Sequence, residues 1–322
     1  MSRRDLIDPE SREPLDALLA VMPGGFNAIP DIVARRATVE QVLASIEVPP
    51  NPRVTSEDRT VPGPDGAPDI MVRIYRPTGD HPVAGAATLP GIYFIHGGGM
   101  VLGDVAGEDA AATMLCDEVG AVVVSVEYRL APEHPHPAPA EDCYAGLQWM
   151  AAHTDEIGVD PARLALYGGS AGGGLVLAVA LMARDRGGPA ISFMMPIYPM
   201  IDDRNETPSS HEITDIGIWD RSGNLEAWAW YLGGQEADGY AAPARVADVS
   251  GLPPAFIDVG TVDMFRDEDI AFAQRLMQAG VPTELHVNPG SYHASEVFAP
   301  EAALSKRIWA MRIDALRRAL AG

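Results

Sequence analysis

The chain has 322 residues, 47% of them apolar and 21% charged, so it is long enough to bury a large core and is not a mainly disordered protein. Its 45 acidic and 23 basic side chains leave a formal net charge of −22, which repels nucleic-acid backbones and anionic lipids. Lys306 is the single lysine and no Gly-Lys pair exists, which excludes ATP or GTP hydrolysis through a Walker phosphate loop.

Cysteine usage indicates a reducing compartment, and hydropathy indicates a chain that does not insert into membranes. Cys116 and Cys143 both lie in apolar stretches and are too few for a disulfide framework or a four-ligand zinc site. Residues 1–6 turn acidic without an apolar segment, and the longest apolar run, Leu175–Ala183, is far shorter than the ~20 residues that span a bilayer. We therefore expect a cytoplasmic protein that does not insert into membranes.

The first part of the chain, to about residue 50, has the pattern of helices interrupted at Pro23-Gly24-Gly25. From about residue 54, short β-rich runs alternate with helical ones, which predicts a mostly parallel sheet with helices on both faces. The apolar runs Gly91–Ile95 and Ala121–Val126 are typical of central strands. Further strands are predicted at Ile70–Tyr75, Arg163–Tyr167, Ile191–Ile197, Ala255–Val259 and Thr283–Val287, and helices at Ala140–Ala151, Ser170–Arg186, Asp267–Ala279 and Glu301–Leu320.

Residues 202–236 break this alternation, because Trp219, Trp228 and Trp230 lie there outside any strand pattern. One interpretation is a helical insertion whose aromatic side chains pack on the main domain. The other is that this segment and the N-terminal helices form a lid over a hydrophobic pocket.

The strongest chemical signal is Gly-x-Ser-x-Gly, formed by Gly168, Ser170 and Gly172 between a predicted strand and a predicted helix. A serine on such a tight turn needs strained backbone angles and small residues two positions before and after it. The following helix N-terminus supplies N–H groups for an oxyanion. A dinucleotide-binding turn is the alternative, but Gly-x-Gly-x-x-Gly is out of register and no acid follows the strand ending near Ile197.

A second glycine-rich segment, His96-Gly97-Gly98-Gly99, ends another predicted buried strand. Three consecutive glycines cost backbone entropy, which makes sense where main-chain N–H groups must approach a site closely. Lipases and esterases use such a loop as half of an oxyanion hole. We interpret His96 as a ring that holds this loop through hydrogen bonds rather than as a base.

A serine nucleophile also needs a base and an acid that orients the base, both from later in the chain. His286 lies inside a predicted strand, whereas His293 follows it in a loop and is the candidate base. Asp263 directly follows a strand and is the candidate acid, because Asp258 lies within that strand and Asp267–Asp269 open a helix, where carboxylates favour the dipole.

No metal or cofactor is implied by the sequence. His134 and His136 alternate with prolines, and two ligands without a third and without zinc-type spacing favour a turn over a metal site.

Taken together, these residues resemble the bacterial hormone-sensitive-lipase-like esterases, family IV of the α/β-hydrolase fold. The resemblance implies an α/β-hydrolase with about eight mostly parallel strands, flanking helices and a helical cap. It implies Ser170, Asp263 and His293 as the triad. It also implies the N–H groups of Gly98, Gly99 and Ala171 as the oxyanion hole, with His96 and Gly97 supporting that loop. The likeness runs from about residue 54 onward and rests on His96–Gly99 with Gly103-Asp104, Tyr128–Glu133, the Ser170 turn, Gly251–Pro254 and Asp263–Glu268.

The resemblance and the two irregular segments together predict a division of the chain. Residues 54–201 and 237–322 form the catalytic domain, residues 1–53 are N-terminal cap helices, and residues 202–236 are a cap insertion. An exposed last strand of the sheet would allow edge-to-edge pairing as a homodimer.

The predicted pocket departs from the family pattern in several places. Met100, Trp219 and Trp228 are its candidate lining residues, and Met100 stands where an aromatic residue is frequent. Gly169 replaces an acidic residue or threonine before the nucleophile, and Ala294-Ser295 replace Gly-Phe after the histidine. No substrate preference is therefore carried over from the family.

The predicted activity is that of a serine carboxylesterase, acting on small hydrophobic esters with short- to medium-chain or aryl groups through an acyl-enzyme. An amidase or arylamide deacylase is an alternative, because the same triad can serve it. A non-catalytic receptor for small molecules is a second alternative on the same fold, but it usually lacks the histidine that His293 provides here.

Overall fold

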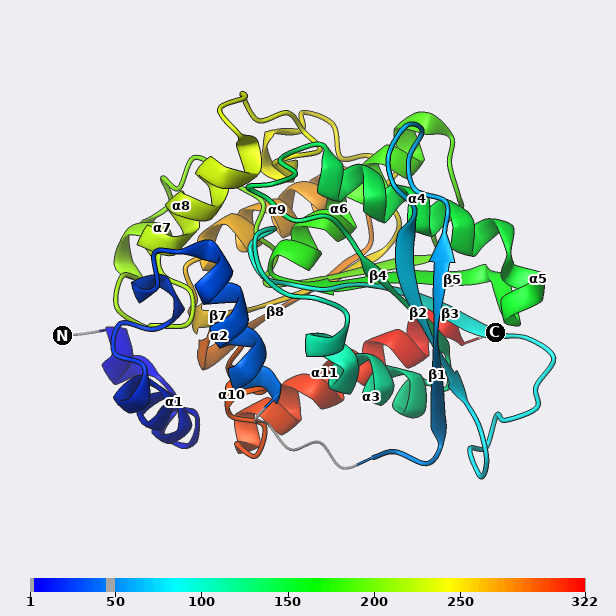
Figure 1. The fold of residues 1–322 in the computed structure, drawn as a ribbon, viewed down its shortest axis with the longest axis horizontal. Helices are drawn as coiled ribbons and strands as arrows, with labels where there is room; N and C mark the ends of the chain where they lie inside the picture. The colour runs from blue at the N-terminus through cyan, green and yellow to red at the C-terminus, as the bar shows by residue number, and fades with distance from the viewer. Residues whose placement is uncertain (1–2, 45–49, 322) are drawn as a thin grey trace.

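Residues 3–44 and 50–321, which the computed structural model describes, fold around an eight-stranded sheet of order β1-β2-β4-β3-β5-β6-β7-β8 (Figure 1). β2 pairs antiparallel with β1 and β4, and all other neighbouring strands are parallel. This confirms the predicted mostly parallel sheet of about eight strands. The bounds are β1 Val54–Val61, β2 Ile70–Pro77, β3 Leu89–Ile95, β4 Val122–Glu127, β5 Val159–Gly169, β6 Phe193–Ile197, β7 Ala255–Val262 and β8 Thr283–Tyr292.

Burial explains which strands were predictable. β3, β4 and β6 are buried along nearly their whole length, so their sequences are continuous apolar runs. β1 was not predicted, because this edge strand pairs only with β2 and carries mostly exposed polar residues.

The helices cover both faces of the sheet. α4 and α6 pack on one face in the larger apolar cluster, and α3 and α11 pack on the other. Within the described residues, no helix combines the length and apolar character needed to cross a bilayer. The bounds are α1 Pro9–Val21, α2 Ile32–Ala44, α3 Asp109–Val119, α4 Ala138–Ala152, α5 Thr154–Ile157, α6 Ala171–Arg186, α7 Pro208–Glu212, α8 Arg221–Leu232, α9 Arg266–Gln278, α10 Ser295–Phe298 and α11 Ala303–Leu320.

The N-terminal helices lie beside the segment that carries α7 and α8 (Figure 1). A Cβ atom on Gly25 would lie 1.8 Å from the carbonyl oxygen of Gly217, so the two backbones touch at a point where only glycine fits. Arg35 of α2 donates to Glu226 of α8 at 2.7 Å. Two segments far apart in sequence therefore pack as one layer.

Arg36 joins α2 to the chain segments that follow β3 and β4. Its guanidinium donates to the carbonyl oxygens of Val101 and Ala131, both at 2.8 Å, and pairs with Glu133. The first of these acceptors lies just after the His96–Gly99 segment, so α2 is fixed to the rim of the predicted site.

Candidate active site

Ser170 lies on the turn between β5 and α6, with φ 58° and ψ −119°. Such a conformation costs on the order of 1–3 kcal/mol in a residue other than glycine, and the surroundings hold it in place. A Cβ on Gly168 would lie 2.6 Å from the Gly172 backbone, and one on Gly172 would lie 2.1 Å from the carbonyl oxygen of Ile95. The two flanking glycines therefore allow β5 and α6 to approach closely enough to form the turn.

The structure brings Ser170, His293 and Asp263 into one hydrogen-bonded row. Asp263 directly follows β7 and His293 directly follows β8. His293 Nδ1 donates to Asp263 Oδ2 at 2.8 Å, which leaves Nε2 to accept from Ser170 Oγ at 2.9 Å. The second oxygen of Asp263 accepts from the Phe265 N–H at 3.0 Å. All three side chains are buried, so their hydrogen bonds act in a medium of low dielectric constant.

The His96–Gly99 segment turns its backbone toward the same site. Gly98 and Gly99 have φ of 112° and 64°, in the region that favours glycine. Neither of their N–H groups donates to another described residue. Ala171 is the first residue of α6, so its N–H has no acceptor within the helix. Of these three residues, Gly98 lines the same cavity as Ser170.

His96 stabilises this segment through contacts of its ring. Its ring stacks on Tyr128 with centroids 4.1 Å apart, and its Nδ1 donates to the carbonyl oxygen of Gly97 at 2.8 Å. Burial lowers the pKa of His96 to about 4, so the ring is neutral at pH 7. The Gly97 N–H donates to Glu108 Oε1 at 3.2 Å. His96 therefore has the contacts of a supporting residue, and it forms none with Ser170.

Ser170 and His293 open into a cavity of about 160 Å³ with mainly apolar walls. Its apolar walls come from four parts of the chain, which are α2 and the turn before it, the loop after β3, the segment after α7, and α10. These residues include Phe26, Val39, Leu43, Leu102, Ile218, Trp219, Val297 and Phe298. Trp219 lines this cavity as predicted, whereas Met100 and Trp228 do not. Met100 is buried against α6, and Trp228 packs on Tyr231 with ring centroids 5.9 Å apart, so both face the apolar core.

Sequence reasoning missed the acidic side chains of this cavity, which are Asp104, Glu108 and Glu296. Burial raises the pKa of Glu108, and the negative charge of Glu296 adds to that effect. Burial alone would also raise the pKa of Glu296, but the Arg312 guanidinium holds it below its usual value. Asp104 lies in the Gly103-Asp104 motif that supports the family resemblance, but no pattern in the sequence assigned Asp104, Glu108 or Glu296 to the cavity.

Tyr198 occupies the space beside Gly169. A Cβ at Gly169 would lie 3.3 Å from Tyr198 Cε2, and the Tyr198 ring meets His293 edge-on with centroids 4.7 Å apart. Tyr198 OH donates to Glu296 at 2.6 Å, and Arg312 bridges Glu296 and Asp258. A buried network thus braces the turn where the family frequently has a larger residue.

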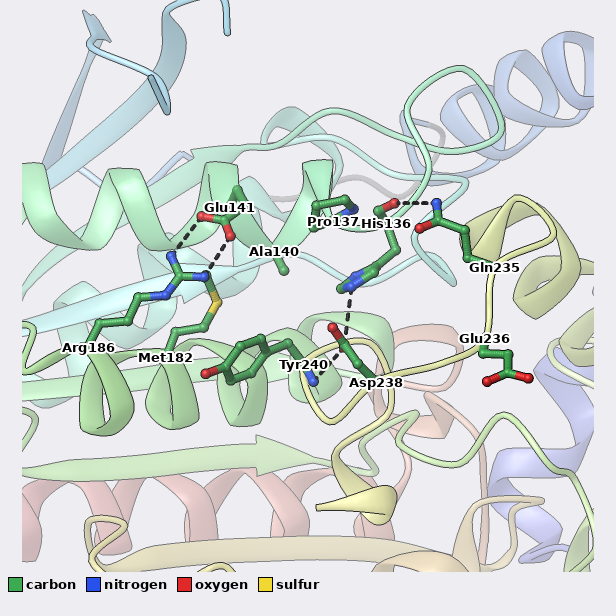
Figure 2. A pocket seen from close by; sticks show the side chains of 10 residues that line it. All are labelled: His136, Pro137, Ala140, Glu141, Met182, Arg186, Gln235, Glu236, Asp238 and Tyr240. Atoms are coloured by element: carbon green, nitrogen blue, oxygen red, sulfur yellow. Dashed lines mark hydrogen bonds and ion pairs between the residues drawn. The ribbon is translucent and has the colours of Figure 1, made fainter. Parts of the chain in front are cut away.

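A second cavity, of about 340 Å³, lies between α4, α6 and the chain after α8 (Figure 2). Its polar groups bind one another: Arg186 pairs with Glu141 at 2.7 Å, and His136 lies 3.3 Å from Asp238. No serine, threonine or cysteine is among its lining residues. The 340 Å³ cavity therefore has no serine, threonine or cysteine nucleophile, and the cavity beside Ser170 is the candidate active site.

A buried Ser–His–Asp row that follows the carboxyl ends of parallel strands, in the chain order Ser, Asp, His, is typical of the α/β-hydrolases. A family model described as the alpha/beta hydrolase fold matches residues 92–297. Carboxylesterase NlhH of Mycobacterium tuberculosis is 37% identical over 99% of both chains, and esterase LipI of that organism is 38% identical over 74% of both. The solved structure of a bacterial heroin esterase superposes with a TM-score of 0.91 at 37% identity, covering 99% of both chains. The chain therefore belongs to the α/β-hydrolase family, on its hormone-sensitive-lipase-like esterase branch.

Proposed function

We propose that this protein is a serine carboxylesterase in which Ser170 is the nucleophile, His293 the general base and Asp263 the residue that orients the base. The observation that carries the proposal is the continuous hydrogen-bonded row from Asp263 through His293 to Ser170, which ends at the cavity. The family to which the chain belongs supports ester hydrolysis.

The geometry supports the following acyl-transfer cycle as part of this proposal. Ser170 Oγ attacks the ester carbonyl carbon while its proton passes to His293 Nε2, and Asp263 stabilises the resulting imidazolium. The N–H groups of Gly98, Gly99 and Ala171 donate to the carbonyl oxygen as it becomes negative. The carbon–oxygen bond to the alcohol then breaks, and His293 returns the proton to the departing alcohol. A water molecule, deprotonated by His293, releases the carboxylic acid and restores Ser170.

The first prediction concerns the nucleophile. Ser170→Ala is expected to lower kcat on p-nitrophenyl acetate by about 10⁴- to 10⁶-fold, as in other serine hydrolases. Ser305→Ala is the control, since this serine is also buried but its Oγ bonds no described residue. A fluorophosphonate should label Ser170 in the parent protein and in the control, as read by peptide mass spectrometry. An active Ser170→Ala protein would refute the assignment.

We also propose that the substrates are small esters with short- to medium-chain or aryl groups, because the cavity is only about 160 Å³. Rates across p-nitrophenyl esters of increasing chain length test this. The p-nitroanilide of the best acyl group tests the amidase alternative, which a faster anilide than ester would favour.

Residues 1–53 and 202–236 are proposed to form the cap of this cavity, since Phe26, Val39, Ile218 and Trp219 from these segments line it. The remaining chain is the catalytic domain. Removing the N-terminal segment should change chain-length preference in a protein that still folds, and unaltered preference would argue against a cap.

The location and the assembly state are further proposals. A cytoplasmic location is supported by two free, buried cysteines, and cell fractionation tests it. Homodimer formation through β8 is supported by its place as the last strand of the sheet, with one edge unpaired within the described residues. If the protein forms this dimer, light scattering after size-exclusion chromatography will show twice the monomer mass. The mass of a monomer would refute the proposed dimer.

A further inference from the structure

The cavity around Ser170 contains carboxylates and no basic side chain other than His293. Of the described residues that line it, Asp104, Glu108 and Glu296 are acidic, and none is lysine or arginine. Six aromatic residues complete the lining: Phe26, Tyr167, Tyr198, Trp219, Phe298 and Trp309. Carboxylates beside aromatic faces are the combination that binds an ammonium group.

Glu108 lies close to the nucleophile. A Cβ at Gly97 would be 3.6 Å from Glu108 Oε1 and 3.7 Å from Ser170 Cβ, so the carboxylate and the serine flank the same glycine. Glu108 accepts one hydrogen bond, from the Gly97 N–H, and forms no ion pair with any described residue. Glu108 therefore has no directly paired counter-ion among the described residues, and Arg312, which acts on it without contacting it, already pairs with Asp258 and Glu296.

Glu296 supplies a second, independent observation. The residue is 2% exposed, and its Oε1 accepts from Tyr198 OH and Arg312 Nη1, both at 2.6 Å. Its Oε2 is buried and has no hydrogen-bond partner among the described residues, and Glu296 is one of the residues that line the cavity. Arg312 also binds both oxygens of Asp258, so one guanidinium is shared between two carboxyl groups.

We propose that this cavity selects carboxylic esters that carry an ammonium group. Glu108 and the unpartnered oxygen of Glu296 attract the cation, and the aromatic rings contact its alkyl substituents. The proposal rests on the proposed ester hydrolysis at Ser170. The net charge of −22 acts in the same direction, because it raises the local concentration of cations near the protein.

A matched pair of esters tests this proposal. Acetylcholine and 3,3-dimethylbutyl acetate share one shape, but the first has a positive nitrogen where the second has carbon. We expect kcat/KM for acetylcholine to exceed that for the neutral ester by about tenfold. Glu108→Gln should lower this ratio by about fivefold, since glutamine keeps the acceptor for the Gly97 N–H and loses the charge. Taking the ratio within each variant cancels any loss common to both esters.

Glu127→Gln is the matched control. Glu127 is also half-buried and also accepts a backbone N–H, that of Val105 at 2.9 Å, but it does not line the cavity. In Glu127→Gln, the ratio of kcat/KM for acetylcholine to that for 3,3-dimethylbutyl acetate should equal the ratio in the parent protein. Glu296→Gln is the second test variant and should lower the ratio as Glu108→Gln does.

The outcomes separate this proposal from ester hydrolysis itself. Turnover of the neutral ester with a ratio of one or less would overturn the cation preference and leave the esterase intact. A high ratio that neither glutamine variant lowers would overturn the role of the carboxylates. Calorimetric titration of the Ser170→Ala protein with both esters measures binding without turnover. Tighter binding of acetylcholine would support the site even if no ester were hydrolysed, and equal binding would refute it.

Discussion

At the scale of single residues, the Tyr198 ring lies directly beside Gly169, where a larger residue would place its side chain. Gly169 has no side chain, and the Tyr198 ring fills the space that a side chain there would need. The same ring contacts His293, so a change beside the nucleophile is transmitted to the base. Gly169, which stands where the family frequently has an acidic residue or threonine, thus leaves room for the Tyr198 ring.

Gly169→Thr is therefore expected to lower kcat by about tenfold or more, because the threonine displaces Tyr198 and with it His293. KM for acetate esters should change less than kcat, because the displaced His293 acts in the chemical step, although Gly169 and Tyr198 both line the cavity. Steady-state kinetics of the variant and of Gly169→Ala, which adds only Cβ, check this. Equal kcat for threonine and glycine at this position would contradict the role of Tyr198.

Asp269 predicts a pH effect on stability. It is fully buried and neither of its oxygens has a partner among the described residues, so burial and the negative charges of Glu268 and Asp263 raise its pKa well above the usual value. The folded state then holds this proton more tightly than the unfolded chain does. Stability contributed by the protonated form is lost as pH rises through the folded pKa.

Asp269→Asn removes this titration, so its Tm relative to the parent should increase as pH rises from about 4 to about 8. Asp314→Asn, at an exposed position paired with Arg318, is the control whose relative Tm should stay nearly constant. A pH-independent difference for Asp269→Asn, measured by thermal melts, would show that this carboxyl does not titrate differently on folding.

The sequence predicted the candidate catalytic residues better than the walls of their cavity. Ser170, Asp263 and His293 follow strand ends, and the order of elements places strand ends together. Met100 and Trp228 are apolar residues that suit a pocket and a core equally, and both pack in the core. Glu296 became visible only in three dimensions, because its partners Tyr198 and Arg312 lie on distant elements.

At the scale of elements, the parallel strands were predictable because each is sandwiched between helices and must be apolar. β1 was not predictable for the opposite reason, since an exposed edge strand with polar residues does not need an apolar sequence. β8 continues past Pro289 and Gly290 to Tyr292, where turn-forming residues indicated an end. Tertiary pairing with β7 extends the strand beyond its local preference.

Arg36 offers a prediction at this scale. Arg36→Met should destabilise the protein by about 1–3 kcal/mol, because the carbonyl groups of Val101 and Ala131 lose a charged donor. It should also raise KM for longer acyl esters more than for acetate, since α2 lines the cavity through Val39 and Leu43. Arg12→Met in α1 is the control, as its ion pairs are long and exposed. Unchanged selectivity would show that α2 is held by other contacts.

At the scale of the whole molecule, the net charge of −22 acts on stability as well as on ligands. Like charges on a compact body repel one another more than on an expanded chain, and salt screens that repulsion. The Tm should therefore rise as NaCl increases from about 0.01 M to about 0.2 M at neutral pH. A falling Tm over this range would mean that the arginine–carboxylate pairs outweigh the general repulsion.

The bridge made by Arg312 has a consequence for the order in which the chain is synthesised. Ser170, Asp263 and His293 all leave the ribosome before Arg312, which lies on α11. Until that helix docks, Asp258 and Glu296 are two carboxylates without their guanidinium, and burying them unpaired costs several kcal/mol. A nascent chain that stops short of α11 thus carries every residue of the row from Asp263 to Ser170, yet cannot bury the network that braces it. We therefore expect this network to close only after α11 has been translated.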